Sequence, residues 1–121
     1  MSERVVTILG VDDEHDILDV YQSVLASDDV IVTTARSFAE FKAIFESRDI
    51  DIVITDHNMG EFNSRDVVAF IKASNKPNTL IYICSSDPPR DVFCDTVKEL
   101  AKPIDFDFLI NQIENKRNSL K

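Results

Sequence analysis

The 121-residue sequence contains few of the residues that build disulfide frameworks and glycine-rich loops. Its only cysteines are Cys84 and Cys94, which we interpret as reduced thiols of a cytoplasmic protein because the sequence shows no secretory signal. They do not have the spacing of metal ligands. With two glycines and four prolines, the turns must rely on Asp, Asn and Ser. Because no repeat, low-complexity segment or interdomain linker divides the chain, we expect one domain over residues 1–121.

The sequence also lacks long hydrophobic runs and an excess of positive charge. The N-terminal apolar run over residues 5–11 is too short for a signal peptide or a membrane span, which leaves the cytoplasm as the expected location. Twenty-two acidic residues outnumber 13 basic ones, giving a net charge of −9. This balance argues against a nucleic-acid-binding surface, which needs clustered Lys and Arg, and suits a bound cation or a basic partner.

Short apolar runs alternate with amphipathic stretches along the whole chain, and this alternation predicts βα units around a parallel sheet. Apolar runs predict five strands, at residues 5–11, 30–35, 50–55, 80–84 and 97–101. Apolar residues spaced three and four apart predict helices after the first three strands and after the last one. The segment 86–96 contains two prolines and only weak periodicity, so we expect a short or irregular fourth helix there, and the polar tail over 115–121 should fray.

The predicted fold class is α/β, a flavodoxin-like doubly wound sheet of five parallel strands in the order 2-1-3-4-5. Such sheets bind ligands at the carboxyl ends of their strands, here between the first and third strands. The first strand ends at Asp12 and Asp13, and the third at Asp56. We therefore predict that three carboxylates converge on one crevice, near the ends of the fourth strand at Ser85 and of the fifth at Lys102.

Three crowded carboxylates repel one another unless a cation or protons offset their charge. Oxygen ligands without His or Cys favour Mg²⁺. An aspartate can also act as a nucleophile and form an aspartyl-phosphate. In such a site Lys102 would supply a positive charge to one phosphoryl oxygen, and a hydroxyl from the fourth strand would bind another.

Three sequence motifs carry a family resemblance. The segments 8–14 (ILGVDDE) and 51–59 (DIVITDHNM) and the pair Lys102-Pro103 occur at the ends of the predicted strands in the right order. Together they closely resemble the receiver domains of two-component response regulators, including single-domain chemotaxis receivers. The resemblance covers residues 5 to about 115. It implies that Asp56 is the phosphoacceptor.

The resemblance also implies roles for the surrounding residues. Asp13 and Asp56 would bind Mg²⁺ directly, Asp12 would act mainly through water, and Asn58 would contribute its backbone carbonyl. Lys102 would contact the phosphoryl group. The implied partners are a histidine kinase or phosphotransfer protein and a downstream protein target, with no nucleic acid and no membrane. The domain would be a monomer or weak dimer, and would assist only its own phosphorylation and dephosphorylation, so we do not expect an enzyme.

Several positions depart from the family pattern. The Ser or Thr that follows the fourth strand corresponds to Cys84 or Ser85, depending on a one-residue alignment choice, and we prefer Ser85 because it keeps a hydroxyl. Glu99 occupies the position of the family's usual aromatic residue. Gly60 and Ser64 replace a proline and a glycine, and the segment from Ser85 to Lys102 is several residues shorter than usual.

Three other functions compete with the phosphorylated receiver. A pseudo-receiver would use the same fold as a phosphorylation-independent docking module, but the retained Asp12, Asp13, Asp56 and Lys102 argue against it. A haloacid-type phosphatase requires Asp-x-Asp after its first strand, whereas here Asp12 and Asp13 are adjacent. A flavodoxin-like FMN protein would have a Ser/Thr/Gly-rich phosphate loop after that strand, and this chain has none.

Overall fold

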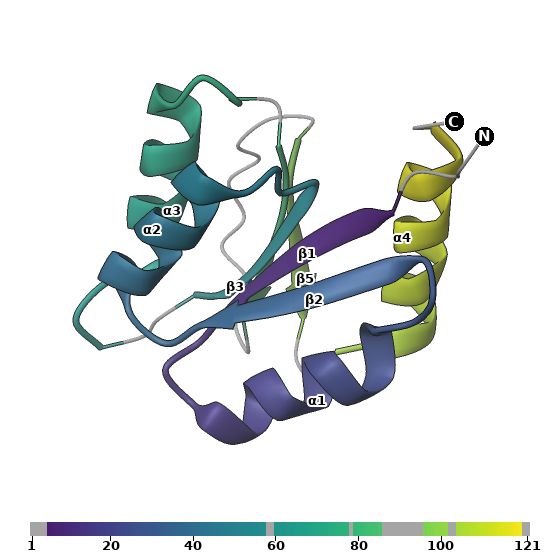
Figure 1. Cartoon of the computed structure of the whole chain (residues 1–121). Coiled ribbons are helices and arrows are strands. Elements are labelled where there is room, and N and C mark those ends of the chain that lie inside the picture. The colour runs from purple at the N-terminus through teal and green to yellow at the C-terminus, as the bar shows by residue number, and fades with distance from the viewer. Residues whose placement is uncertain (1–4, 58–59, 78, 86–95, 102–103, 120–121) are drawn as a thin grey trace.

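A computed structural model describes residues 5–57, 60–77, 79–85, 96–101 and 104–119. Strands and helices alternate along this part of the chain until β4 (Figure 1). In chain order they are β1 (Val6–Val11), α1 (His15–Leu25), β2 (Val30–Ala35), α2 (Phe38–Ser47), β3 (Ile52–Asp56), α3 (Ser64–Ala73), β4 (Leu80–Ser85), β5 (Val97–Ala101) and α4 (Phe106–Ser119). The five predicted strands are all present, with ends shifted by two residues at most.

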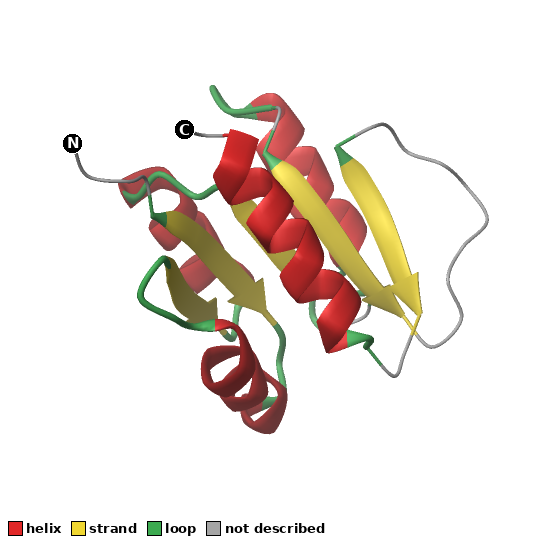
Figure 2. Ribbon diagram, turned by 90° about the vertical axis from the view of Figure 1, so that its right-hand side faces the viewer, coloured by secondary structure: helices red, strands yellow, loops and turns green. Residues whose placement is uncertain are grey.

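The five strands form one parallel sheet in the order β2-β1-β3-β4-β5, which confirms the predicted doubly wound fold. Helices α2 and α3 cover one face of the sheet, and α1 and α4 cover the other (Figures 1 and 2). The predicted fourth helix falls largely on residues 86–95, outside the residues that the structure describes. Strand order reverses between β1 and β3, so ligands are expected at that edge.

Each face of the sheet packs against its helices through its own hydrophobic cluster. On the side of α2 and α3, four phenylalanine rings (Phe38, Phe41, Phe45 and Phe70) lie in mutual contact, with Phe41 fully buried at the centre. On the side of α1 and α4, the cluster includes Tyr21, Tyr82 and Cys84. Successive strand residues alternate between these clusters because side chains of a β-strand point to opposite faces in turn.

Helix α3 begins with a complete capping box. The Asn63 side chain accepts hydrogen bonds from the backbone N–H groups of Arg65 (2.9 Å) and Asp66 (3.3 Å), and the Asp66 carboxylate accepts from the Asn63 N–H (3.0 Å). These bonds satisfy N–H groups that have no partner inside the helix. The cap therefore fixes the start of α3, which directly follows the loop after β3.

Replacing the capping residue should weaken the fold measurably. We expect Asn63→Ala to lower the free energy of unfolding by about 1 kcal/mol, because the backbone N–H groups of Arg65 and Asp66 lose their side-chain acceptor. Urea unfolding followed by circular dichroism checks this value. Asn111→Ala is the control, since Asn111 is an exposed residue within α4. An equal loss in both variants would contradict the role of the cap.

The C-terminal tail corrects one sequence-based prediction. The polar segment from Asn115 was predicted to fray, but α4 continues to Ser119. Arg117 Nη1 lies 3.3 Å from Asp29 Oδ2, in the turn before β2. Lys116 and Arg117 also place positive charge at the C-terminal end of the helix, where the helix dipole favours it. A polar sequence is thus held in the helix by charge interactions that its hydrophobic pattern does not predict.

Candidate functional site at the carboxyl edge of the sheet

Three aspartates meet at the switch point of the sheet. Asp12 and Asp13 directly follow β1, and Asp56 is the last residue of β3, the neighbouring strand. One carboxylate oxygen from each of the three lies within 4.8 Å of the others. Asp12 and Asp56 are only 3% and 9% exposed, while Asp13 lies at the surface. The predicted convergence of these three residues is confirmed, and they form an oxygen-only cluster open to solvent on one side.

The ionised form of Asp12 is unfavourable in this position. Burial, followed by the nearby charges of Asp56 and Asp13, raises the pKa of Asp12 to about 6. A hydrogen bond from the Glu14 N–H to Asp12 Oδ1 (2.9 Å) opposes this rise without cancelling it. A divalent cation would remove the repulsion that raises this pKa, so the carboxylates fit a hard metal ion.

The chain that leaves Asp56 is tied to both β4 and α3. The His57 N–H donates to the Cys84 carbonyl (2.9 Å), and His57 Nδ1 lies 3.0 Å from the hydroxyl of Ser64, which is buried at the start of α3. Gly60 has a φ of +81°, a conformation that proline cannot adopt. A Cβ atom added at Gly60 would lie 4.0 Å from Asp13 Oδ2, so this loop returns beside the cluster. The two departures from the family pattern at 60 and 64 therefore have local structural roles.

The remaining predicted site residues are only partly described. Asn58 and Lys102 lie outside the described residues, and the structure describes Ser85 as the last residue of β4 without its side chain. Cys84, rather than Ser85, is the strand partner of Asp56. Glu99 lies on β5 opposite Ile83, and both oxygens of its carboxylate are buried.

One residue near the cluster does not stand out in the sequence as a site residue. The hydroxyl of Tyr21, on α1, points into the protein and donates to Cys84 Sγ at 3.9 Å. Burial and the nearby Cys84, Asp12 and Asp56 raise the pKa of Tyr21 far above its usual value. One sequence signal was Gly10, since a Cβ there would lie only 3.0 Å from the Tyr21 ring.

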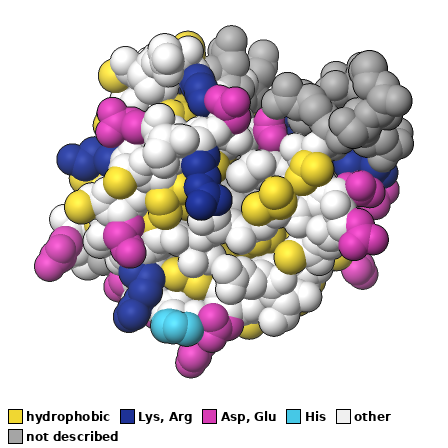
Figure 3. Space-filling model, viewed as in Figure 1, with side chains coloured by type: hydrophobic (Ala, Val, Ile, Leu, Met, Phe, Trp, Pro, Cys, Tyr) yellow, Lys and Arg dark blue, Asp and Glu magenta, His cyan; other side chains and the backbone are white. Residues whose placement is uncertain are grey.

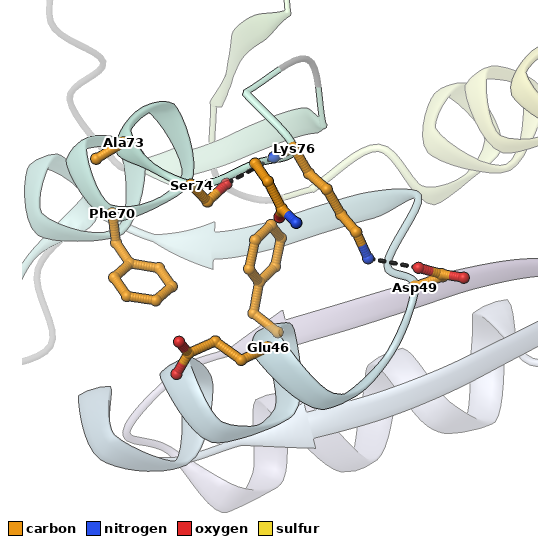
Figure 4. A pocket seen from close by; sticks show the side chains of 8 residues that line it. Glu46, Asp49, Phe70, Ala73, Ser74 and Lys76 are labelled. Atoms are coloured by element: carbon orange, nitrogen blue, oxygen red, sulfur yellow. Dashed lines mark hydrogen bonds and ion pairs between the residues drawn. The ribbon is translucent and has the colours of Figure 1, made fainter.

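One hollow between α2 and α3 lies away from the aspartates. It has a volume of about 640 Å³ between the C-terminal ends of α2 and α3, and Phe45 and Phe70 contribute to its wall (Figure 4). An ion pair between Lys76 and Asp49 crosses one side of it. Helix α3 begins beside the aspartates, and the hollow lies at the opposite end of this helix. We therefore assign the hollow no part in the chemistry of the aspartate cluster.

On the face shown in Figure 3, exposed apolar side chains lie between acidic, basic and polar side chains. Val24 on α1 and Ile110 on α4 line a hollow of about 130 Å³ between these helices. Within the described residues, no helix combines the length and hydrophobicity needed to cross a bilayer.

An acidic cluster at the switch point of a 2-1-3-4-5 sheet defines a class of signalling domain, and comparisons identify the family. The family model for the response regulator receiver domain matches residues 8–114. This chain belongs to that family, the receivers of two-component systems, which are signalling domains and not classical enzymes.

Relatives and solved structures agree with this assignment. The response regulator SaeR of Staphylococcus aureus is 31% identical over an alignment of 113 positions, which covers 88% of this chain and 49% of SaeR. The chain thus spans about half the length of the curated relatives it matches. A receiver domain from Clostridium thermocellum is 29% identical, with a TM-score of 0.80 over 95% of this chain and 96% of that one.

A further structure shows the fold with a ligand bound. The response regulator TrrA of Thermotoga maritima, in complex with Mg²⁺ and BeF, has a TM-score of 0.79 and 23% identity, over 93% of this chain and 99% of that one. At this identity the likeness establishes the fold alone.

Proposed function

We propose that this receiver accepts one phosphoryl group on Asp56 in a Mg²⁺-dependent reaction and signals through phosphorylation-dependent protein binding. The observation that carries the proposal is the meeting of three carboxylates within 4.8 Å at the carboxyl edge of the sheet. A structural role does not require this arrangement, because it raises the pKa of Asp12 and destabilises the metal-free site. Such a cost is typical of a functional site.

Asp56 is the proposed nucleophile. One of its carboxylate oxygens would attack the phosphorus of a phosphohistidine, forming the new P–O bond as the P–N bond breaks, and the imidazole would leave after taking up a proton. Asp56 is held by its place at the end of β3 and by the backbone bond from His57 to Cys84. This attachment to the sheet fixes the direction from which the donor must approach.

The metal would be held by Asp13 and Asp56 directly and by Asp12 through water, with the Asn58 carbonyl as a further ligand, as the family resemblance implies. When bound, Mg²⁺ would neutralise charge on the transferring phosphoryl oxygens. Lys102 would bind one of these oxygens, and a group at the end of β4, Ser85 or Cys84, would bind another.

Phosphorylation should depend on the metal. With acetyl phosphate and MgCl₂, we expect the intact mass to rise by one phosphoryl group, and EDTA in place of MgCl₂ should prevent the rise. Hydroxylamine should remove the group, because it cleaves acyl phosphates. An unchanged mass with Mg²⁺ would contradict the proposal and favour the pseudo-receiver, which docks without phosphorylation.

The partners are proposed by class only. A histidine kinase or a phosphotransfer protein would supply the phosphoryl group, and a downstream protein would bind the phosphorylated form. The 22 acidic side chains suit a partner with a basic contact surface. We propose that these encounters occur in the cytoplasm and that the receiver acts as a monomer or weak dimer.

A further inference from the structure

Cys84 lies directly beside the proposed acceptor. Asp56 and Cys84 are paired residues of the parallel strands β3 and β4, and paired residues project to the same face of a sheet. Cys84 is fully buried in the cluster under α1 and α4, whereas the preceding Ile83 belongs to the cluster on the opposite face. A buried thiol therefore lies next to the acceptor on the strand that flanks it.

The hydroxyl of Tyr21 reaches this thiol from α1. Tyr21 is 1% exposed, and its hydroxyl donates to Cys84 Sγ at 3.9 Å. The ring passes over Gly10 of β1, where an added Cβ would lie only 3.0 Å from it, and its edge meets the ring of Phe106 at a centroid distance of 6.4 Å. Because Gly10 has no side chain, the Tyr21 ring can pack against β1 and place its hydroxyl beside Cys84.

This hydroxyl is not explained by packing. Burying a hydroxyl is unfavourable unless it finds a good partner, and sulfur is a weak acceptor. Phenylalanine would fill the same space without this cost. The charges of Asp12 and Asp56 add to the effect of burial and raise the Tyr21 pKa further, which places the hydroxyl within electrostatic range of the aspartates and keeps it protonated. The hydroxyl is thus well placed to act on the site through Cys84.

We propose that Tyr21 is a positioning residue, which holds the Cys84 thiol in the orientation that serves phosphoryl transfer at Asp56. With Tyr21 bound to the sulfur, the S–H group of Cys84 can turn toward the acceptor and donate to the phosphoryl group. Without Tyr21, the thiol loses its fixed rotamer. This inference rests on the proposed function and adds a positioning contact to it.

The test compares two tyrosine variants. Tyr21→Phe should lower the rate of phosphorylation by acetyl phosphate about two- to tenfold, the equivalent of one neutral hydrogen bond. Tyr82→Phe is the matched control, because Tyr82 is equally buried on β4 but its hydroxyl donates to Gln112 Oε1 on α4. It should leave the rate unchanged, and Mg²⁺ affinity should be unchanged in both variants.

A second readout reports the thiol directly. In a Cys94→Ser background, which leaves Cys84 as the only thiol, Tyr21→Phe should shift the infrared S–H stretching band and Tyr82→Phe should not. In a Cys84→Ala background, Tyr21→Phe should no longer change the phosphorylation rate, because the proposed effect passes through the sulfur.

The outcomes separate this inference from the proposed function. If wild type takes up no phosphoryl group, both are overturned. If wild type is phosphorylated and Tyr21→Phe reacts at the wild-type rate, only the positioning role fails. An equal loss of rate in Tyr21→Phe and Tyr82→Phe, or a loss that persists without Cys84, would also overturn it by pointing to a purely structural effect.

Discussion

Asp56→Asn is expected to abolish phosphoryl uptake. An amide oxygen is far less nucleophilic than a carboxylate oxygen, and the substitution preserves the size of a side chain that is 9% exposed at the end of β3. The intact mass after treatment with acetyl phosphate and Mg²⁺ should therefore remain that of the unmodified protein. The loss of phosphorylation should be complete, because Asp12 and Asp13 follow β1 and do not occupy the position of the acceptor at the end of β3.

A second aspartate beside the same strand provides the control. Asp51 precedes β3 at the opposite edge of the sheet, and its carboxylate accepts a hydrogen bond from the Thr7 N–H (2.9 Å). Asp51→Asn removes the same charge and keeps an acceptor oxygen, so we expect it to be phosphorylated like wild type. If Asp56→Asn still gained a phosphoryl group, peptide mass spectrometry would locate another acceptor and the assignment of Asp56 would be wrong.

Asp12→Asn should stabilise the metal-free protein at neutral pH. Asp12 is 3% exposed and its pKa is raised to about 6, mainly by burial and by the charges beside it. The asparagine side chain keeps an oxygen for the Glu14 N–H but carries no charge. In EDTA at pH 7, we expect a gain in unfolding free energy of about 1–3 kcal/mol, from the linkage between pKa and stability.

Because the pKa of Asp12 is raised in the folded protein, the contribution of this residue to stability depends on pH. The folded protein holds the Asp12 proton more tightly than the unfolded chain does, so this group stabilises the fold fully below pH 3.8 and loses that contribution as pH rises to about 6. The difference in urea midpoint between Asp12→Asn and wild type should therefore be small at pH 4 and large at pH 7. A difference independent of pH would contradict this explanation.

Magnesium should reduce the difference in stability between the two proteins. Wild type should gain more stability from MgCl₂ at pH 7 than Asp12→Asn, because the bound ion relieves a repulsion that the variant has already lost. Equal gains in both proteins would show that Asp12 takes no part in metal binding. Thermal unfolding at matched ionic strength, with NaCl in place of MgCl₂, checks the result.

Much of the candidate site could be predicted because it depends on local pattern and topology. The runs before Asp12 and Asp56 are apolar enough to be buried strands, and parallel strands bring their carboxyl ends to one edge. Once β1 and β3 are neighbours in the sheet, the aspartates at their carboxyl ends must lie close together. By contrast, the segment after Asn115 was predicted to fray because it is polar. Its sequence does not reveal that Arg117 pairs with Asp29, which lies 88 residues away.

The pattern of consecutive residues is enough to predict the alternation of strands and helices and to place the aspartates at the ends of the first and third strands, because hydrophobic periodicity is a local property of the chain. The pairing of Cys84 with Asp56, and the contact of the Tyr21 hydroxyl with Cys84 across Gly10, appear only in the folded protein. Strand register and side-chain contacts between distant elements depend on how the whole core packs, and no local pattern of residues encodes that packing.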